Sequence, residues 1–599
     1  MPARGAKRKA PTNGMANGRP NKRAEAVIAP SSPGAFSSPD PLRRPHPLYK
    51  AAEENGIVLR NFYPREMSNA RARAYNSNEI HRPIEQLQSV LADTAAFRSR
   101  VPVRGAVVHW FKMDLRLSEN TALSIACDRA REAGVPLLAL YVASPQDWEA
   151  HLTAPVRVDF VLRTLRVLQE DLARLDIPLH VEMVPERKDV PVRILQLMKE
   201  WGASHLFANM EYEVDELRRE ARMVTLLAEK GLVMEVEHDT CVVPPGKLVS
   251  GQGRQYAVYS PWFRAWVSHV QDNPELLEPI DPLSRNPAAV RERYGTLFTV
   301  DIPEAPTSKS LTAEQKERYR SLWPAGEHEA MRRLAMFCEE KIRGYKDNRN
   351  LPYEAGTSNL SVHFASGTLS ARTAVRTARD ANSSKKLDGG DEGIRTWISE
   401  VAWRDFYKHV LVNWPYVCMN KPFKPEYSNI DWSYDTSRFT AWAEGRTGFP
   451  LVDAAMRQLH NCGWMHNRCR MVVASFLAKD LLLDWRMGER FFMEHLVDGD
   501  FASNNGGWGF AASVGVDPQP YFRIFNPLLQ SEKFDPLGEY IRKWVPELRD
   551  VEGKAVHDPY GRGAAELARQ RGYPKPIVEH KGSRETALAA YKKGIESDM

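Results

Sequence analysis

Short apolar runs alternate with amphipathic segments from residue 105 onward. The apolar runs are bounded by turn residues, which is typical of strands buried on both faces, and the segments between them have helical periodicity. Strands are expected at 106–111, 136–142, 178–184, 205–209 and 233–236, and helices at 121–133, 158–175, 190–202 and 214–230. This alternation predicts an α/β domain over 103–243, with a parallel sheet covered by helices on both faces.

The pattern changes after Pro244-Pro245-Gly246. Residues 244–326 are rich in proline and have only short helical patterns, so we interpret them as an interdomain connector. Apolar residues from Met331 to Ile342 then recur on one helical stripe, and similar patterns continue to about residue 548. The pattern predicts an all-α domain over 327–599.

Residues 1–102 differ from the rest, because Pro, Gly, Ser and Asn interrupt any apolar periodicity. We expect a largely disordered basic extension, with one short helix near 84–91. Lys7-Arg8-Lys9 and Lys22-Arg23 resemble a bipartite nuclear-import signal, although such clusters also occur in merely solvated tails. A shorter product that begins at Met67 would start with an arginine-bearing stretch, which would favour a mitochondrial address. The nucleus is the predicted location, with the mitochondrion as the alternative.

Composition narrows the class of protein without deciding it. The net charge of +6 over 599 residues does not by itself indicate a nucleic-acid binder, so any basic face must be local. The six cysteines have no C-x-x-C spacing, which argues against a metal site and a disulfide framework and favours a reducing compartment. No apolar run approaches eighteen residues, so we expect a soluble protein without a membrane span.

Residues 447–526 contain the densest candidate chemistry. A cationic run that also offers an amide lies at 465–471, and an acid and amide segment, expected to be a loop, lies at 498–505. Two glycines, Gly506 and Gly507, would allow a ring to approach the backbone there. Trp464, Trp485 and Trp508 accompany these segments. Each feature alone is compatible with ordinary core packing, but their joint order is not.

Two further segments offer polar groups of the right kind. Residues 356–361 place hydroxyl and amide donors just before a helix, where they would either cap the helix or hold a phosphate. Residues 400–407 place Glu400, Trp403 and Tyr407 on one helical face, with Arg404 beside it. An isolated helix with this sequence would be read as amphipathic, with an acid and an arginine paired across one turn.

These motifs together resemble the photolyase and cryptochrome family from about residue 105 to 594, and within it the eukaryotic class I branch that repairs cyclobutane pyrimidine dimers with a folate antenna. The resemblance implies a Rossmann-like α/β antenna domain and an all-α domain that binds FAD. The residues that match the FAD site are Tyr345, Thr357, Ser358, Asn359, Leu360, Ser361, Trp397, Glu400, Arg404, Asn467, Arg470, Asp498, Asp500 and Asn504. Within this set, Asp498 is expected to pair with Arg470.

The same resemblance assigns roles in repair. Glu400, Trp403, Asn467 and Met471 match the catalytic residues, and Trp432, Trp485 and Trp508 match an electron-transfer triad. Residues expected to contact DNA are Arg349, Trp403, Arg404, Arg468, Met471, Lys479 and Phe510. Phe510 stands where many relatives have tryptophan. Asn504 is the choice of repair enzymes, and the run at 465–471 lacks the pattern of the branch that repairs (6-4) photoproducts.

Asp215, Glu216 and Cys418 match positions that hold a folate antenna, 5,10-methenyltetrahydrofolate, in folate-using members. Asp215 replaces the usual asparagine, and Met419 stands where some relatives have lysine, so a deazaflavin antenna remains an alternative. Lys112 also replaces an arginine in the opening strand motif.

The implied activity is light-dependent repair, in which photoexcited reduced FAD gives one electron to a flipped-out dimer and the electron returns. The expected protein is a monomer that binds ultraviolet-damaged DNA. A cryptochrome that signals through protein partners is the first rival, opposed by Asn504 and by the lack of a long C-terminal tail. A dual enzyme and regulator is a variant of it. A flavin oxidoreductase that uses NAD(P)H is a weaker rival, since no G-x-G-x-x-G follows the first strand.

Overall fold

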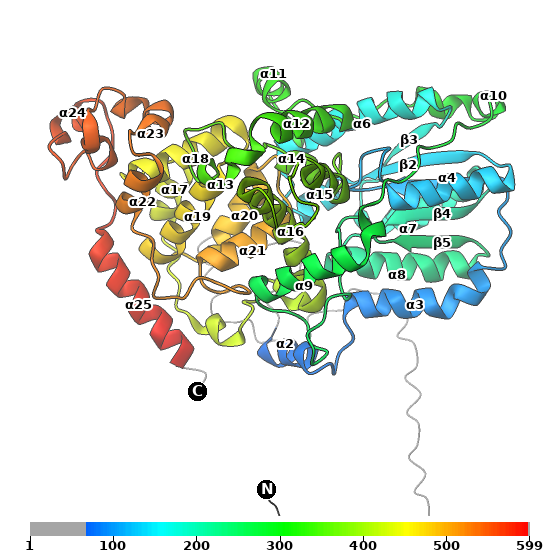
Figure 1. The fold of residues 1–599 in the computed structure, drawn as a ribbon, viewed down its shortest axis with the longest axis horizontal. Coiled ribbons are helices and arrows are strands. Elements are labelled where there is room, and N and C mark those ends of the chain that lie inside the picture. Colours follow the sequence, from blue (N-terminus) through cyan, green and yellow to red (C-terminus); the bar gives the residue numbers. More distant parts are fainter. Residues whose placement is uncertain (1–67, 597–599) are drawn as a thin grey trace, which may run out of the picture. The chain divides into compact units, whose positions relative to one another are not determined.

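A computed structural model describes residues 68–596. Its α/β part contains a parallel sheet with the strand order β3-β2-β1-β4-β5 (Figure 1). The strands are β1 (Ala106–Phe111), β2 (Leu137–Ala143), β3 (Leu179–Met183), β4 (Ala203–Asn209) and β5 (Val233–Glu237). The order reverses direction between β1 and β4, which is where ligands bind in sheets of this kind. The predicted parallel, Rossmann-like sheet is confirmed.

The alternation of side chains along β1 explains why both faces of the sheet are covered. Val108 and Trp110 pack into the core that includes side chains of several helices on one face, whereas Val107 and Phe111 pack into the core on the other face. The helices of the α/β part are α4 (Thr121–Ala133), α5 (Pro145–Ala150), α6 (Pro155–Arg174), α7 (Val190–Glu200) and α8 (Val214–Glu229).

The segment before the sheet is folded, so the expectation of disorder is wrong for residues 68–102. It forms α2 (Asn69–Asn76) and α3 (Pro83–Arg98), and α3 lies along α8 (Figure 1). Ile84 and Leu87 are buried there, and an ion pair joins Arg98 to Glu235 on β5. The helix expected near 84–91 is therefore present and longer, because its apolar stripe has a partner. Residues 1–67, which carry the basic clusters, lie outside the described residues.

Between the sheet and the helical part lie α9 (Tyr259–Asp272), α10 (Ala289–Arg293) and α11 (Ala313–Leu322), with several 3-10 turns. The helical part follows, as predicted. Its helices are α12 (Glu327–Glu340), α13 (Tyr345–Asn348), α14 (Ser361–Ser366), α15 (Ala371–Asp380), α16 (Glu392–Asn413), α17 (Thr436–Ala443), α18 (Pro450–Cys462), α19 (Asn467–Ser475), α20 (Trp485–His495), α21 (Phe501–Ala511), α22 (Pro527–Phe534), α23 (Glu539–Trp544), α24 (Ala565–Gln570) and α25 (His580–Glu596). None of the helices between residues 68 and 596 is long and apolar enough to cross a membrane.

A buried carboxylate fixes α16 relative to the connector. Asp405 Oδ2 accepts hydrogen bonds from the backbone N–H groups of Val242 and Val243 at 2.8 and 3.2 Å, and from Trp266 Nε1 at 3.1 Å. Burial raises the pKa of Asp405 to about 6. These bonds join the end of the α/β part, α9 and α16 around one side chain, and α16 carries several of the candidate site residues.

Candidate functional site

Helix α16 places an acid, Glu400, and an aromatic ring, Trp403, on neighbouring turns. The helix begins where the Asp391 carboxylate accepts hydrogen bonds from the N–H groups of Gly393 and Ile394. Glu400 forms an ion pair with Arg349. Burial raises the pKa of Glu400, although the arginine acts in the opposite direction. The site therefore contains a carboxyl group that holds its proton more strongly than an ordinary glutamate.

Helix α19 contributes the cationic run. His466 begins it by accepting a hydrogen bond on Nδ1 from the Arg468 N–H at 3.2 Å, and burial lowers the pKa of His466 to about 4. Asn467, the first residue of α19, is exposed, and Met471 is half-buried one turn later. The Arg468 guanidinium donates to Asn350 Oδ1 at 2.9 Å and lies near enough to Glu400 to lower its pKa. The acid of α16 and the start of α19 are thus neighbours.

The expected pair between Arg470 and Asp498 is present, with Arg470 Nη2 at 2.8 and 3.1 Å from the two carboxylate oxygens. The sequence analysis expected a loop at 498–505, and this expectation is wrong from residue 501 onward. Asp500 Oδ1 accepts from the Ser503 N–H at 2.8 Å and so starts α21, which contains Asn504. Asn504 Nδ2 donates to the carbonyl of Glu489 at 2.9 Å.

The glycines of α21 have a packing role that the sequence reading missed. A Cβ at Gly506 would lie 2.2 Å from two ring carbons of Tyr407, so this glycine lets α21 approach α16 closely. At Gly507 a Cβ would meet no atom within 4 Å. Only Gly506 is therefore required by a close approach, and the partner in that approach is Tyr407.

The turn at 356–361 lies beside the cationic run. Ser361 Oγ accepts a hydrogen bond from Trp464 Nε1 at 3.2 Å, and Thr357 Oγ1 donates to Asn359 Oδ1 at 3.1 Å. Asn359 has a left-handed backbone with φ of 53°. Leu360 is buried and Ser358 is half-buried. The turn therefore offers hydroxyl and amide groups at a position joined directly to Trp464.

Two aromatic rings of the predicted FAD site share one neighbour. The Tyr345 ring meets Phe337 edge to face at 5.8 Å, and Trp397 lies 5.3 Å from the same phenylalanine. Burial raises the pKa of Tyr345. Trp397 belongs to a buried core and Tyr345 packs against it, so the structure gives both rings a packing role.

The three tryptophans of the expected triad lie in a single buried core. The segment of Trp432 runs beside that of Trp485, as the hydrogen bond from the Ser433 N–H to the Leu482 carbonyl at 2.8 Å shows. Trp508 packs against α20, where a Cβ at Gly488 would lie 2.0 Å from its ring. Among the described residues, neither Trp485 Nε1 nor Trp508 Nε1 has a hydrogen-bond partner. The core thus links α20, α21 and the segment before α17.

Residues 107–283 match the family model described as DNA photolyase, and residues 397–593 match the FAD binding domain of DNA photolyase. The chain is 65% identical to the deoxyribodipyrimidine photo-lyase of Neurospora crassa, over 99% of each chain. The chain belongs to the photolyase and cryptochrome family. It is also 35% identical to the mitochondrial deoxyribodipyrimidine photo-lyase of Saccharomyces cerevisiae, over 90% of this chain and 95% of the relative.

A solved structure agrees with this family assignment. The crystal structure of a bacterial class III photolyase from Agrobacterium tumefaciens has a TM-score of 0.71 and 31% identity, and it covers 82% of this chain and 98% of its own. FAD is the cofactor of the matched domain, and the donor set fits it. The hydroxyl groups at 357–361 suit a diphosphate, and the Arg470 cation and Asn504 amide suit the polar edge of a flavin ring.

Several residues that the family resemblance assigned to DNA are engaged within the protein. Lys479 is only 1% exposed and donates to Ser513 Oγ and the Arg523 carbonyl at 2.8 and 2.9 Å, so its assignment as a DNA contact is wrong. It lies in a π-helical turn, Phe476–Asp480, all of whose residues are buried. Arg404 donates to the carbonyls of Thr240 and Phe364, which also holds it away from a surface.

The other cations of that set are not free either. Arg349 is paired with Glu400, and Arg468 lies with its guanidinium carbon 4.4 Å from the centre of the Phe534 ring. Phe510 is half-buried at the end of α21.

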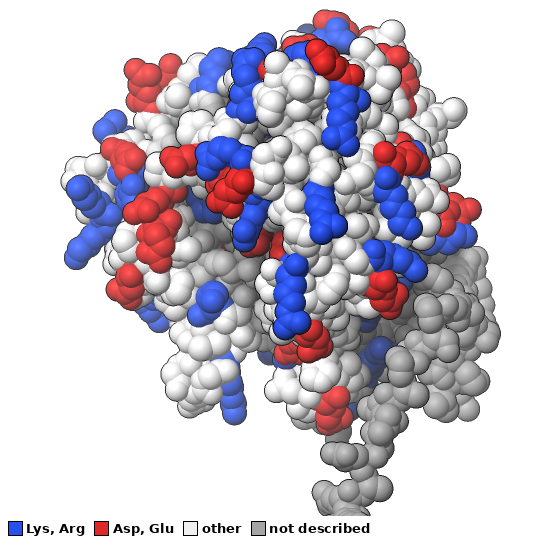
Figure 2. Space-filling model, turned by 90° about the vertical axis from the view of Figure 1, so that its right-hand side faces the viewer, with Lys and Arg blue, Asp and Glu red and all other residues white. Residues whose placement is uncertain are grey.

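Figure 2 shows the end of the molecule formed by the α/β part, where blue and red side chains are intermingled over the described residues. The acidic and basic side chains of that face therefore offset one another.

A cavity of about 160 Å³ lies at the carboxyl edge of the sheet, bounded by strand ends and by Arg404, Lys408 and Asp500 of the helical part. Glu216 of the predicted antenna set lines it. Asp215 instead faces Arg187 at 3.3 Å, and Cys418 is buried in a 3-10 turn, Pro415–Met419. The cavity is thus lined by only one of the three residues expected to hold the antenna.

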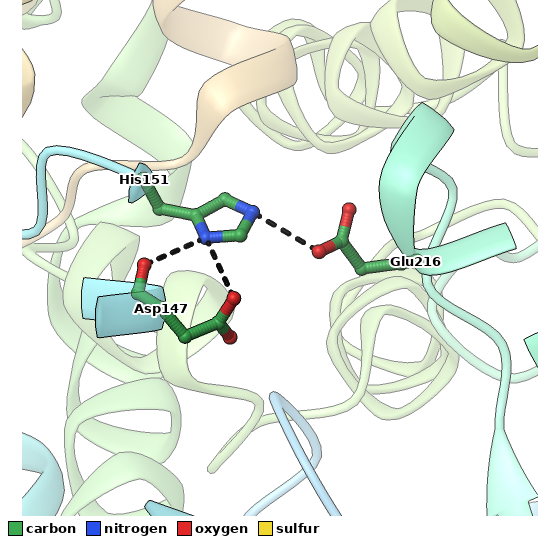
Figure 3. A group of neighbouring side chains, drawn as sticks. All are labelled: Asp147, His151 and Glu216. Atoms are coloured by element: carbon green, nitrogen blue, oxygen red, sulfur yellow. Dashed lines mark hydrogen bonds and ion pairs between the residues drawn. The ribbon is translucent and has the colours of Figure 1, made fainter. Parts of the chain in front are cut away.

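Figure 3 shows the His151 ring between Asp147 and Glu216. His151 Nε2 lies 3.1 Å from Glu216 Oε1, and Nδ1 lies 3.5 Å from Asp147 Oδ1. Burial alone would lower the pKa of His151, but the two carboxylates raise it well above its ordinary value. The three groups are close enough to hold a metal ion. Without a metal ion, the three groups form an ion-paired cluster around the His151 ring.

Sequence reasoning missed three residues that the structure brings to these sites. His151 and Arg157 line the cavity at the sheet edge, and Tyr259 stacks on Trp403. Arg157 is only 8% exposed, and among the described residues its Nη1 has no hydrogen-bond partner. The position of His151 at the end of a helix after the second strand is a signal that could have been used, because ligands bind at strand ends.

Proposed function

We propose that the protein is a deoxyribodipyrimidine photo-lyase, which repairs cyclobutane pyrimidine dimers in DNA under light. The 65% identity to the Neurospora crassa enzyme over the whole chain supports this activity. The observation that carries the proposal to particular residues is the cluster of Glu400, Arg349 and Arg468, in which a carboxyl group of raised pKa lies beside Trp403. Such a group suits a lesion that becomes more basic when it accepts an electron.

Bound FAD, in its reduced and photoexcited form, would supply one electron to the dimer, and this electron would return once the ring had opened. The chain's residues position the lesion and stabilise charge. Arg470, paired with Asp498, places a fixed cation in the proposed flavin site. Asn504, held by the Glu489 carbonyl, is proposed to present its amide to the flavin ring. The turn at 357–361 is proposed to hold the diphosphate.

Glu400 is proposed to act in its protonated form. A carboxylic acid can donate a hydrogen bond to a carbonyl oxygen of the dimer and stabilise the negative charge that appears there. The raised pKa favours this form. Arg349 limits the effect, and its release from Glu400 on DNA binding would raise the pKa of Glu400 further. Asn467, exposed at the start of α19, and Met471, one turn later, are proposed to contact the same lesion.

Recognition of damage is proposed to depend on extrusion of the dimer. Photolyases belong to the enzymes that take their target out of the stack, and a damaged base costs less to extrude than an intact one, because it is already poorly paired. Trp403, Met471 and Phe510 would line the receiving site. Phe510 in place of a larger ring would still stack, with about 1 to 3 kcal/mol per base expected from such contacts.

Trp508, Trp485 and Trp432 are proposed to carry an electron to oxidised flavin from the protein surface. Their location in one buried core supports this role, because a buried aromatic path excludes water. The redox state of the flavin in the resting protein would then determine whether the path is needed for repair.

A second chromophore is proposed to bind at the carboxyl edge of the sheet and pass its excitation energy to FAD. A folate, 5,10-methenyltetrahydrofolate, is preferred over a deazaflavin. Glu216 supports this location because it lines the cavity with the protonated His151. Asp215 and Cys418 do not line the cavity, so they would support the bound folate only from outside it. Chromophores released from the purified protein, separated and identified by absorption, would distinguish a folate from a deazaflavin.

Domain limits and cellular context complete the proposal. We place the division at 103–243 for the antenna domain, 244–326 for the connector and 327–599 for the catalytic domain. The protein is proposed to act as a monomer in the nucleus, with a mitochondrial form as the alternative. The mitochondrial name of the Saccharomyces cerevisiae relative supports that alternative.

The test uses an oligonucleotide with one thymine dimer and pre-reduced, FAD-containing protein, under blue light and in darkness. A (6-4) photoproduct in the same sequence is the matched control substrate. The proposal predicts light-dependent loss of the dimer alone. Repair of neither lesion by protein that retains FAD would contradict it and favour a signalling role.

A further inference from the structure

A tyrosine from outside the helical part covers one face of Trp403. The rings of Tyr259 and Trp403 lie 3.5 Å apart, centre to centre, with 8° between their planes. Tyr259 is the first residue of α9, in the segment that matches the DNA photolyase model rather than the FAD binding domain. The closest aromatic contact of Trp403 therefore comes from a different part of the chain than the helix that carries it.

Tyr259 is held in place at both ends. Its Oη donates to the Ser399 carbonyl at 2.7 Å and lies 2.8 Å from Ser399 Oγ, and its N–H donates to Asp517 Oδ2 at 2.9 Å. The side chain is buried, and the ring also meets Phe406 edge to face at 5.5 Å. Since Ser399 precedes Glu400 on α16, the tyrosine is fixed to the helix that bears both the acid and Trp403.

This contact leaves one side of the indole available. A parallel stack at this distance excludes solvent from one face of Trp403, yet Trp403 remains only half-buried. Among the described residues no second aromatic ring stacks in parallel on Trp403, since Phe406 and Tyr407 meet it at 84° and 36°. A ring that is already fixed loses less conformational freedom when a ligand stacks on it, so the stack prepares Trp403 for binding.

We propose that Tyr259 is a positioning residue for damage recognition, which holds the Trp403 indole so that its open face stacks on the extruded dimer. This inference rests on the proposed function, in which Trp403 is one wall of the lesion site. Tyr259 itself does not touch the lesion. It acts through the orientation of the indole, and its phenol ring, rather than its hydroxyl alone, is the part that acts.

Two substitutions separate the ring from the hydroxyl. Tyr259→Phe keeps the stack and should leave the affinity for dimer-containing duplex within about twofold of wild type. Tyr259→Leu removes the stack and should weaken that affinity about tenfold, which corresponds to ~1.4 kcal/mol. Affinity for the undamaged duplex, FAD content and the yield of repair once the lesion is bound should stay unchanged in both. Equal loss on damaged and undamaged DNA, or no rescue by phenylalanine, would overturn the proposal.

A double-mutant cycle tests whether Tyr259 acts through Trp403. In a Trp403→Leu background, Tyr259→Leu should have no further effect on dimer affinity, because the ring that it positions is gone. A further loss of about tenfold in that background would overturn the positioning role while leaving Trp403 as a wall. Trp403→Leu protein that binds the dimer as tightly as wild type would instead overturn the proposed lesion site, and this inference with it.

Discussion

Glu216 in the α/β part and Glu400 in the helical part are both shielded acids with a cation in contact, yet their proton affinities are shifted in opposite directions. Glu216 is 5% exposed and faces a protonated histidine, which lowers its pKa well below the ordinary value despite burial. Glu400 is 31% exposed and faces Arg349, but burial prevails and its pKa is raised. One acid is a fixed charge, whereas the other can hold a proton.

The difference separates the two regions by the kind of work they can do. The cluster at the sheet edge is saturated by ion pairs, since Arg187 lies 3.6 Å from Glu216 in addition to His151. Such a cluster can shape a cavity and fix its field, and its Glu216 carboxylate stays ionised at neutral pH. The face of α16 combines an acid of raised pKa with an aromatic wall. We therefore expect the bond-breaking chemistry in the helical part.

The largest expected effect separates two activities within the helical part. Trp508→Phe should almost eliminate light-driven reduction of oxidised flavin, because it interrupts the proposed electron path, while repair by chemically reduced protein stays near wild type. Absorption spectra of the oxidised protein under blue light, and repair after chemical reduction, would measure the two. Trp442→Phe is the control, since this buried ring lies 6.1 Å from Trp508 but outside the proposed triad. Equal loss of both activities would refute the triad.

Removal of the acid in the helical part should have the next largest effect. Glu400→Ala should lower the repair yield by about tenfold or more, which is less than the roughly hundredfold or greater contribution typical of a general acid, and affect DNA affinity less. Glu400→Gln is the matched control, because its amide can still donate a hydrogen bond, and it should retain most of the yield. The measurement is repair per absorbed photon with saturating, dimer-containing DNA. An unchanged yield in the alanine variant would remove Glu400 from the mechanism.

The matching change at the sheet edge should alter stability and light collection, not chemistry. His151→Gln leaves Glu216 with less compensation for burial and should cost about 1 to 3 kcal/mol of unfolding free energy. Repair driven by direct excitation of the flavin should stay within about twofold of wild type. Denaturant unfolding and repair at two wavelengths would measure these effects. His180→Gln is the control, because this histidine pairs with Glu182 outside the cavity. A large loss of directly excited repair would erase the contrast between the two regions.

The sequence predicted the sheet and the helical part well, because buried parallel strands and amphipathic helices have distinct periods. It also predicted the pair of Arg470 and Asp498, since their segments resemble a family motif. The prediction for Lys479 was wrong, because the whole turn Phe476–Asp480 that carries it is buried in the core. The sequence analysis also took Asn504 for a loop residue, because the capping role of Asp500 depends on a hydrogen bond that composition does not reveal.

The sequence analysis missed the role of Tyr259 and the folded state of residues 68–102 for a different reason. The stack of Tyr259 on Trp403 joins segments far apart in the chain, and nothing in either local pattern encodes it. Helix α3 has only a modest apolar face, and its stability depends on Ile84 and Leu87 reaching the surface of α8. Long-range contacts of this kind become visible only once the elements are packed together.

The most direct test of the contrast between the two acids is the pH dependence of repair yield with saturating damaged DNA. The pKa of Glu400 is raised above 4.5, so its protonated form should persist to higher pH than for an ordinary glutamate. The wild-type yield should fall as pH rises through this shifted pKa, while the Glu400→Gln yield stays flat and the His151→Gln yield follows wild type. The same pH dependence in wild type and Glu400→Gln would contradict the account.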